Sequence, residues 1–248
     1  MAFKKLENGR KFNNYDLLKS LAFFTMIIDH VGLFFFNKIK FLRVIGRTSA
    51  IIYAILFGIN KKKNNDKIII GAIAMSMAWT LLQNRIFPLN VLYNFYLSGF
   101  LVDSLNNLYS KNFLLFLLVL ILLVAIGEKS DFYLLEYGTY FLMLIFCGRL
   151  FRKKEMTRRD KVLAAIIFIV FFCQQTMHME FNVGQSLVLF AIFSAIYFTF
   201  LNFEFRELGN IPGKGLLMFV SRYSAELFVL QEILFIVSLW LLLITGKI

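Results

Sequence analysis

The sequence predicts an all-α, polytopic integral membrane protein with about nine membrane-spanning helices, in a range of eight to ten. Hydrophobic residues make up 59% of the 248 positions, and the mean hydropathy is +0.71. Apolar runs of about 17–25 residues, the length that a helix needs to cross a bilayer, recur along the chain. The 2 Pro and 14 Gly leave little room for a loop-rich or all-β protein. A soluble domain of this length would expose more charge, so we expect a lipid bilayer around the chain.

The apolar segments follow one another with short polar connections, and we expect one transmembrane domain over residues 1–248. The predicted segments are 16–36, 41–59, 68–87, 89–108, 113–126, 132–151, 162–177, 183–203 and 215–244. The fifth is short for a bilayer, and the ninth, of about thirty residues, is longer than a bilayer needs. The start of the ninth carries Arg222 and Glu226, and we expect it to lie along the membrane interface before the chain turns inward.

The loop charges predict the orientation. With the N-terminus in the cytoplasm, the inner loops hold 18 Lys and Arg residues and the outer loops with the C-terminus hold 6. This three-to-one bias is a positive-inside signal, and it favours an odd number of spans with the C-terminus outside. The net charge of +12 mostly reflects the same bias, so nucleic acid is not an expected partner. Cys147 and Cys173 lie in apolar runs, where a free Cys acts as a small hydrophobe, and we expect neither a disulfide nor a metal site.

The first two segments form the hairpin that carries Asp29, His30 and Arg47. His30 lies about eight residues before the middle of the turn and Arg47 about eight after it. At 1.5 Å per residue, both are roughly 9–12 Å below the outer helix ends. Ionisable groups at this depth are costly and mark functional sites. We expect Arg47 to reach Asp29 or a substrate oxygen, and His30, whose ordinary pKa is about 6.5, to act as a general base. The alternative is a structural Asp29–Arg47 pair without chemistry.

Lys19 extends the polar character of the first helix toward the cytoplasm. Lys19 and His30 are eleven residues apart, about three turns, so both project from nearly the same face. A polar stripe of this kind implies a water-filled or substrate-filled groove. Taken alone, Lys19 and Arg43 are better explained as long basic side chains that reach the lipid headgroups from helix ends.

Further polar residues are predicted at the outer turns and in the last segment. Asn90, Glu136 and His178 either rim an outward-facing acceptor site above His30 or are ordinary solvated loop residues. Arg222 and Glu226 are four residues apart and can pair on one helix face. They either anchor an interfacial helix or face the polar groove, where Arg222 would bind an anionic ligand.

Four stretches resemble, in order, the TraX family of conjugal-pilin acetylases: "DLLKSLAFFTMIIDHVG", "LRVIGRTSAIIYAILFGIN", "LNVLYNFYLSGF" and "EYGTYFLMLIFCGRLF". The closing "SRYSAELFVLQEILF" is similar to the last helix of that family. Two departures are clear. After its "GR" pair the family usually has an apolar-Phe-Pro turn, where this chain has Thr48, Ser49 and Ala50, and Gln231 stands where the last family helix has a His.

The resemblance implies a membrane acetyltransferase of the bacterial inner membrane, in the wider group of transmembrane acyltransferases. By the family pattern, acetyl-CoA comes from the cytoplasm, and the acceptor is the N-terminal amine of a pilin or another peptide at the outer side. His30 matches the histidine of the family's Asp-His motif, Asp29 its neighbour and Arg47 the "GR" arginine. Lys19 and Arg222 are the candidates for binding the phosphates of CoA, and no metal is expected.

The main rival is a proton-coupled secondary transporter in which Asp29, His30 and Arg47 form a relay. Against it, the sequence has no evident inverted repeat and no paired helices broken by Gly or Pro, which are common in transporters. A purely structural membrane protein is the third alternative, and it gives no reason for a histidine at that depth.

Overall fold

The computed structural model describes residues 11–36, 38–60, 66–83, 90–133, 137–209 and 211–245. These residues form helices, and no strand occurs among them beyond an isolated bridge between Asn13 and Glu207. The helices are α2 (Asn14–Phe34), α3 (Lys40–Gly46), α4 (Thr48–Ile59), α5 (Asp66–Gln83), α6 (Val91–Lys111), α7 (Phe113–Tyr133), α8 (Tyr140–Phe151), α9 (Arg158–Met179), α10 (Val183–Leu201), α11 (Lys214–Arg222) and α12 (Ser224–Ile244). The prediction of an all-α fold is confirmed.

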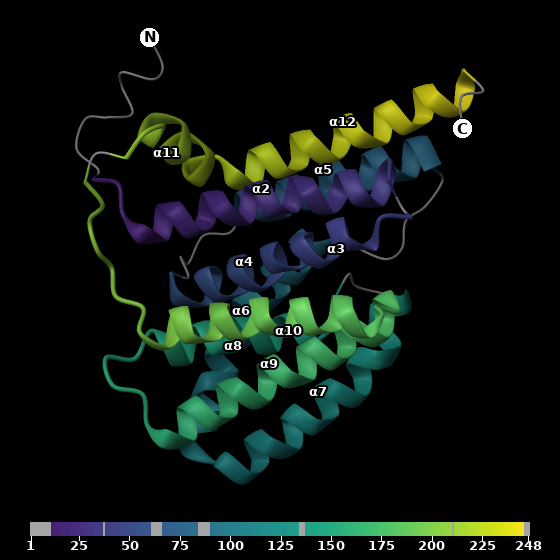
Figure 1. Cartoon of the computed structure of the whole chain (residues 1–248). Coiled ribbons are helices and arrows are strands. Elements are labelled where there is room, and N and C mark those ends of the chain that lie inside the picture. Colours follow the sequence, from purple (N-terminus) through teal and green to yellow (C-terminus); the bar gives the residue numbers. More distant parts are fainter. Residues whose placement is uncertain are drawn as a thin grey trace.

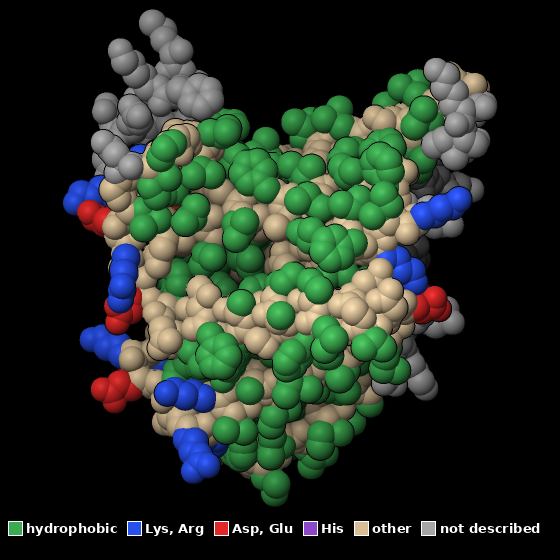
Figure 2. All heavy atoms as spheres, in the orientation of Figure 1, with side chains coloured by type: hydrophobic (Ala, Val, Ile, Leu, Met, Phe, Trp, Pro, Cys, Tyr) green, Lys and Arg blue, Asp and Glu red, His purple; other side chains and the backbone are tan. Residues whose placement is uncertain are grey.

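The surface of the molecule is that of a membrane protein. Figure 2 shows hydrophobic side chains across the middle of one face, with the charged side chains gathered toward the two ends of the helices. Five described segments are long and apolar enough to cross a membrane: Asn14–Phe34, Lys40–Ile59, Arg158–Met179, Val183–Leu201 and Ser224–Leu242. Shorter apolar stretches accompany them at Ile68–Leu81, Phe113–Gly127 and Tyr140–Phe151. The number of crossings and their orientation stay predictions.

Helix α4 lies at the centre of the molecule, between α2 with α12 on one side and α8 with α10 on the other (Figure 1). The closest packing joins α4 to α8. A Cβ built on Gly58 would lie 2.0 Å from the carbonyl oxygen of Ile145, and one built on Gly148 would lie 2.3 Å from that of Ile55. Small residues let helix backbones approach in membranes, where packing contacts drive helix association. These two glycines therefore fix α8 against α4.

The start of α2 is tied to α11 and to the segment that leads into it. Asn13 and Asp16 form a capping box that starts α2, which satisfies two backbone donors at its N-terminus. The backbone N–H of Leu208 donates to the carbonyl of Phe12 at 2.9 Å. In α11, Ser221 donates to Oδ1 of Asp16 at 2.7 Å. The start of α2 and the helix α11 thus lie at the same end of the molecule (Figure 1).

Two predicted segments are each divided into two helices. The second is divided at Arg47, because the hydroxyls of Thr48 and Ser49 donate to the carbonyls of Ile45 and Gly46, three residues back. Such side-chain bonds compete with the regular helix pattern. The ninth is divided at Tyr223 into the amphipathic α11 and the apolar α12. The fifth segment extends to Tyr133 rather than ending at residue 126, and the sixth becomes α8, which begins only at Tyr140.

Candidate active site

The site is built where α2 and α3 cross. A Cβ on Gly46 would lie 2.2 Å from the Cβ of Asp29 and 2.5 Å from its Cα. A Cβ on Gly32 would lie 2.8 Å from the Cβ of Leu42. Two glycines therefore allow the two backbones to come close enough for the side chains beside them to meet. This explains why the Asp-His pair and the Gly-Arg pair act as one structural unit.

Asp29 receives two arginine side chains at this crossing. Its Oδ2 lies 3.5 Å from Nη2 of Arg47 and 3.2 Å from Nη1 of Arg43. The side chains of Asp29 and Arg47 are 5% and 6% exposed. The prediction that Arg47 reaches Asp29 is confirmed. Arg43 was expected to reach the headgroups, and this is wrong: its side chain is only 12% exposed and it also donates to the Asp29 carbonyl.

The side chain of Arg47 also contacts Tyr137, in the turn before α8. Its Nη1 donates to the hydroxyl of Tyr137 at 2.9 Å, and its guanidinium lies 5.4 Å from the centre of the Tyr137 ring. Tyr137 has a φ of 64°, a left-handed backbone that is a genuine outlier for a bulky residue. Such conformations cost about 1–3 kcal/mol and persist where the surroundings enforce them. The contact with Arg47 is one of the interactions that hold Tyr137 there.

Side chains of α12, the last helix, contact His30. Its Nδ1 lies 2.7 Å from Oε1 of Glu232 and 2.7 Å from Nε2 of Gln231. The rings of Phe228 and Phe235, also on α12, lie 6.0 and 6.4 Å from the imidazole ring. The side chains of His30 and Glu232 are 12% and 6% exposed. A second buried carboxylate thus adjoins the histidine, and it comes from the other end of the sequence.

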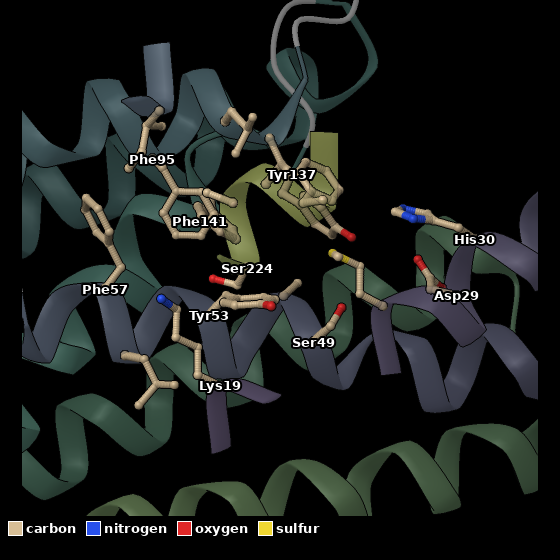
Figure 3. Close-up of a pocket in the computed structure, with 18 of the residues that line it drawn as sticks. Lys19, Asp29, His30, Ser49, Tyr53, Phe57, Phe95, Tyr137, Phe141 and Ser224 are labelled. Atoms are coloured by element: carbon tan, nitrogen blue, oxygen red, sulfur yellow. The ribbon is translucent and has the colours of Figure 1, made fainter. Parts of the chain in front are cut away.

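A cavity of about 170 Å³ runs along α2 between these groups. Figure 3 shows Lys19 toward one end and Asp29 and His30 at the other, with Tyr53, Ser224 and Ser49 between them. Phe57, Phe95 and Phe141 form apolar walls. The expected groove from Lys19 to His30 is therefore present, and most of its lining is apolar. Its walls suit a long ligand that is mostly apolar and is polar at a few points.

The other predicted residues lie elsewhere. Asn90 caps α6, accepting from the N–H of Leu92, and its amide donates to the carbonyl of Ala72 and the hydroxyl of Ser76. This is a buried structural role. Arg222 is exposed at the end of α11, and His178 is exposed near the end of α9. Neither belongs to the cavity wall among the described residues. Glu136 lies outside the described residues.

Three features of the site were not identified from the sequence: Glu232 beside His30, Tyr137 beside Arg47, and the pairing of Arg43 with Asp29. Glu232 gave a usable signal, because an acidic residue inside an apolar run is expected to be functional. Tyr137 gave none, since its role depends on an unusual backbone conformation. Among the described residues, no group of three or more His, Cys, Asp and Glu could hold a metal ion.

One protein family matches most of the chain in sequence. A family model described as "TraX protein" matches residues 14–231, a range that includes α2, the α2–α3 crossing and α12 as far as Gln231. An uncharacterised protein of Rickettsia prowazekii (strain Madrid E) is 24% identical over 228 residues, which cover 88% of this chain and 84% of that protein. No solved structure matches.

Proposed function

Because the chain belongs to the TraX family, we propose that it is a membrane acetyltransferase. In this proposal it moves the acetyl group of cytosolic acetyl-CoA to an acceptor amine at the outer face. The acceptor best supported by the family is the N-terminus of a pilin or another peptide. The observation that carries the proposal is one cavity with a lysine toward one end and a histidine at the other.

The length and the lining of the cavity support a binding site for the reacting arm of acetyl-CoA. Eleven residues of α2 separate Lys19 from His30, about 16 Å along the helix axis. The ammonium of Lys19 suits a phosphate group as a point charge, and the phenylalanine walls suit the aliphatic parts of the pantetheine arm. Arg222 lies outside the cavity wall, so Lys19 alone is retained here for the phosphates.

The residues at the outer end supply acid–base and electrostatic functions. Acetyl-CoA supplies the activated carbonyl carbon. His30 accepts a proton from the acceptor amine as the amine nitrogen forms its bond to that carbon and the carbon–sulfur bond breaks. His30 then returns the proton to the departing thiolate, so that protons and charges balance.

Arg47 acts through its neighbours, because it lies behind the cavity wall. It holds the carboxylate of Asp29 and donates to the hydroxyl of Tyr137. A hydroxyl that accepts a bond from a guanidinium is a better donor itself. We therefore assign Tyr137 as the group that donates to the carbonyl oxygen as negative charge develops on it.

The test uses purified protein in detergent, labelled acetyl-CoA and a peptide with a free N-terminal Ala. The same peptide with a blocked N-terminus serves as the substrate control. His30→Ala should abolish labelling of the peptide, whereas His178→Ala, the only other histidine of the chain, should leave it unchanged. Thermal unfolding of each variant shows that the fold is retained.

Three outcomes decide the proposal. Label on the free peptide that depends on His30 supports amine acetylation. Equal labelling with His30→Ala removes His30 from the mechanism. If acetyl-CoA neither stabilises the protein against heat nor donates its label, the transferase proposal fails and the proton-coupled transporter becomes the better explanation.

A further inference from the structure

We infer that Glu232 is a positioning residue that holds His30 in a single tautomer, with the proton on Nδ1 and the basic lone pair on Nε2. The inference rests on the proposed function for its catalytic meaning. Its structural part, the tautomer of His30, can be measured without any activity.

The contact distance carries the first step. Oε1 of Glu232 lies 2.7 Å from Nδ1 of His30, an ion-pair distance, but the two groups are not aligned as a hydrogen bond, and Oε1 has no hydrogen-bond partner in the described part of the chain. Glu232 is 4% exposed and sits inside α12. A buried carboxylate at membrane depth costs several kcal/mol unless it is paired. A proton on Nδ1 would supply the missing donor after a small rotation of the carboxylate, and the bond would strengthen when the ring becomes an imidazolium.

Gln231 supports the same proton position when the nitrogen and oxygen of its amide are exchanged. Its amide nitrogen is drawn 2.7 Å from Nδ1, while its own Oε1 is buried without a hydrogen-bond partner in the described part of the chain. If the amide group of Gln231 is turned by half a turn, its oxygen lies next to Nδ1 of His30 and its nitrogen points away from the ring. Both side chains then accept from one Nδ1–H, and Nε2 is left as the acceptor. Where the last helix of the TraX family has a histidine, this chain has Gln231, whose side chain is uncharged.

The position of these residues on α12 explains how the ring is held. Phe228 and Phe235 lie one turn before and one turn after Gln231 and Glu232, on the same helix face. Their rings lie 6.0 and 6.4 Å from the imidazole, and Phe34 of α2 lies 6.3 Å from it. Three aromatic rings restrict the plane of the imidazole, and one carboxylate fixes its proton. Asp29, which neighbours His30 in sequence, is instead occupied by Arg43 and Arg47.

The structural test is nitrogen NMR of protein labelled with ¹⁵N-histidine in detergent. The His178→Ala variant leaves His30 as the only histidine. We expect Nδ1 to show the shift of a protonated ring nitrogen and Nε2 that of an unprotonated one. In Glu232→Gln, the two tautomers should become mixed. A wild-type ring with its proton on Nε2 would overturn the inference.

The kinetic test compares Glu232→Gln with Glu226→Gln, which changes an exposed glutamate on the same helix. Glu232→Gln should lower kcat at least about 10-fold and leave KM for acetyl-CoA unchanged, and Glu232→Asp should restore part of kcat. Glu226→Gln should behave like the wild type. Unchanged kcat in Glu232→Gln would overturn the positioning role. If the wild type transfers no acetyl group, the proposed function fails, and the NMR result still decides whether Glu232 sets the tautomer.

Discussion

Oδ2 of Asp29 lies 3.5 Å from Nη2 of Arg47, and this pair joins α2 to the junction of α3 and α4. Burying two charges is expensive, and their attraction repays it only when the geometry is good and further hydrogen bonds are made. Here Arg47 also binds Tyr137, and Asp29 also binds Arg43. The pair therefore serves as the junction between three parts of the site.

Removing Arg47 should be strongly destabilising, because it leaves Tyr137 and Asp29 with fewer partners. We expect Arg47→Ala to cost about 3–5 kcal/mol, the usual range for breaking a buried pair, measured as a fall in the unfolding midpoint in detergent. The control is Arg206→Ala, which breaks an exposed pair with Glu204 and should cost under about 1 kcal/mol. Similar midpoints for the two variants would contradict the buried role.

Gly46→Ala should disrupt the helix crossing. The new Cβ would meet the Cα of Asp29 at 2.5 Å, which the backbone can relieve only by moving α3 away from α2. Overpacking of this kind costs about 1–3 kcal/mol or more, and transfer activity should fall with stability. Gly184→Ala is the matched helical control, since its nearest atom lies at 3.5 Å. A Gly46→Ala protein as stable and active as Gly184→Ala would refute the close approach.

Lys19→Met should weaken the binding of acetyl-CoA while leaving the chemistry intact. We expect KM to rise about tenfold, equivalent to about 1.4 kcal/mol, with little change in kcat. Lys19→Arg should keep most of the affinity because the charge remains. Arg222→Gln is the control, as Arg222 was predicted for the same role but lies outside the cavity wall. An effect of Arg222→Gln larger than that of Lys19→Met would reverse the assignment.

Tyr137→Phe should lower kcat without a matching change in KM, because it removes a donor used mainly in the transition state. The loss of one such donor typically costs about 10²–10³ in kcat. Phe141→Leu, a change in the apolar wall, should affect KM more than kcat. A wild-type kcat in Tyr137→Phe would contradict the proposal that Arg47 acts on the substrate through Tyr137.

Cysteine labelling tests the orientation. In a variant with Cys147 and Cys173 replaced by Ser, Lys154→Cys between α8 and α9 should react with an impermeant thiol reagent only after the membrane is opened. Glu180→Cys, between α9 and α10, should react in intact cells. Both side chains are exposed. The opposite pattern would invert the topology and, with it, the side from which acetyl-CoA arrives.

The hairpin of the site was predictable because short connections and helix rise fix relative depth. Asp29, His30 and Arg47 could be placed together on those grounds alone, and so could the face shared by Lys19 and His30. Glu232 could not be placed, because the last segment exceeds the bilayer in length and its register against α2 is set by tertiary contacts. The hydrogen bonds of α11 to the start of α2 and the packing of α12 against α2 and α5 together determine which residue of α12 meets His30.

Arg43 and Asn90 show a different limit of sequence reasoning. Arg43 has the position of a headgroup-reaching side chain, but the glycines at the crossing bring Asp29 close enough to compete for it. Asn90 has the position of a rim residue, but an asparagine just before a helix also satisfies the helix N-terminus. For both residues, the position of the side chain depends on a nearby partner that the linear sequence does not reveal.

The packing of α12 against α2 has a consequence for biogenesis. His30 is made long before Glu232, and the cavity wall needs Ser224, Ala225 and Phe228 as well. Until α12 has left the ribosome and inserted, α2 has no carboxylate for its histidine, and one side of the cavity is lacking. A chain cut short after α10 would keep α2 to α10 but would have no closed cavity. Closure of the cavity therefore waits for the insertion of α12.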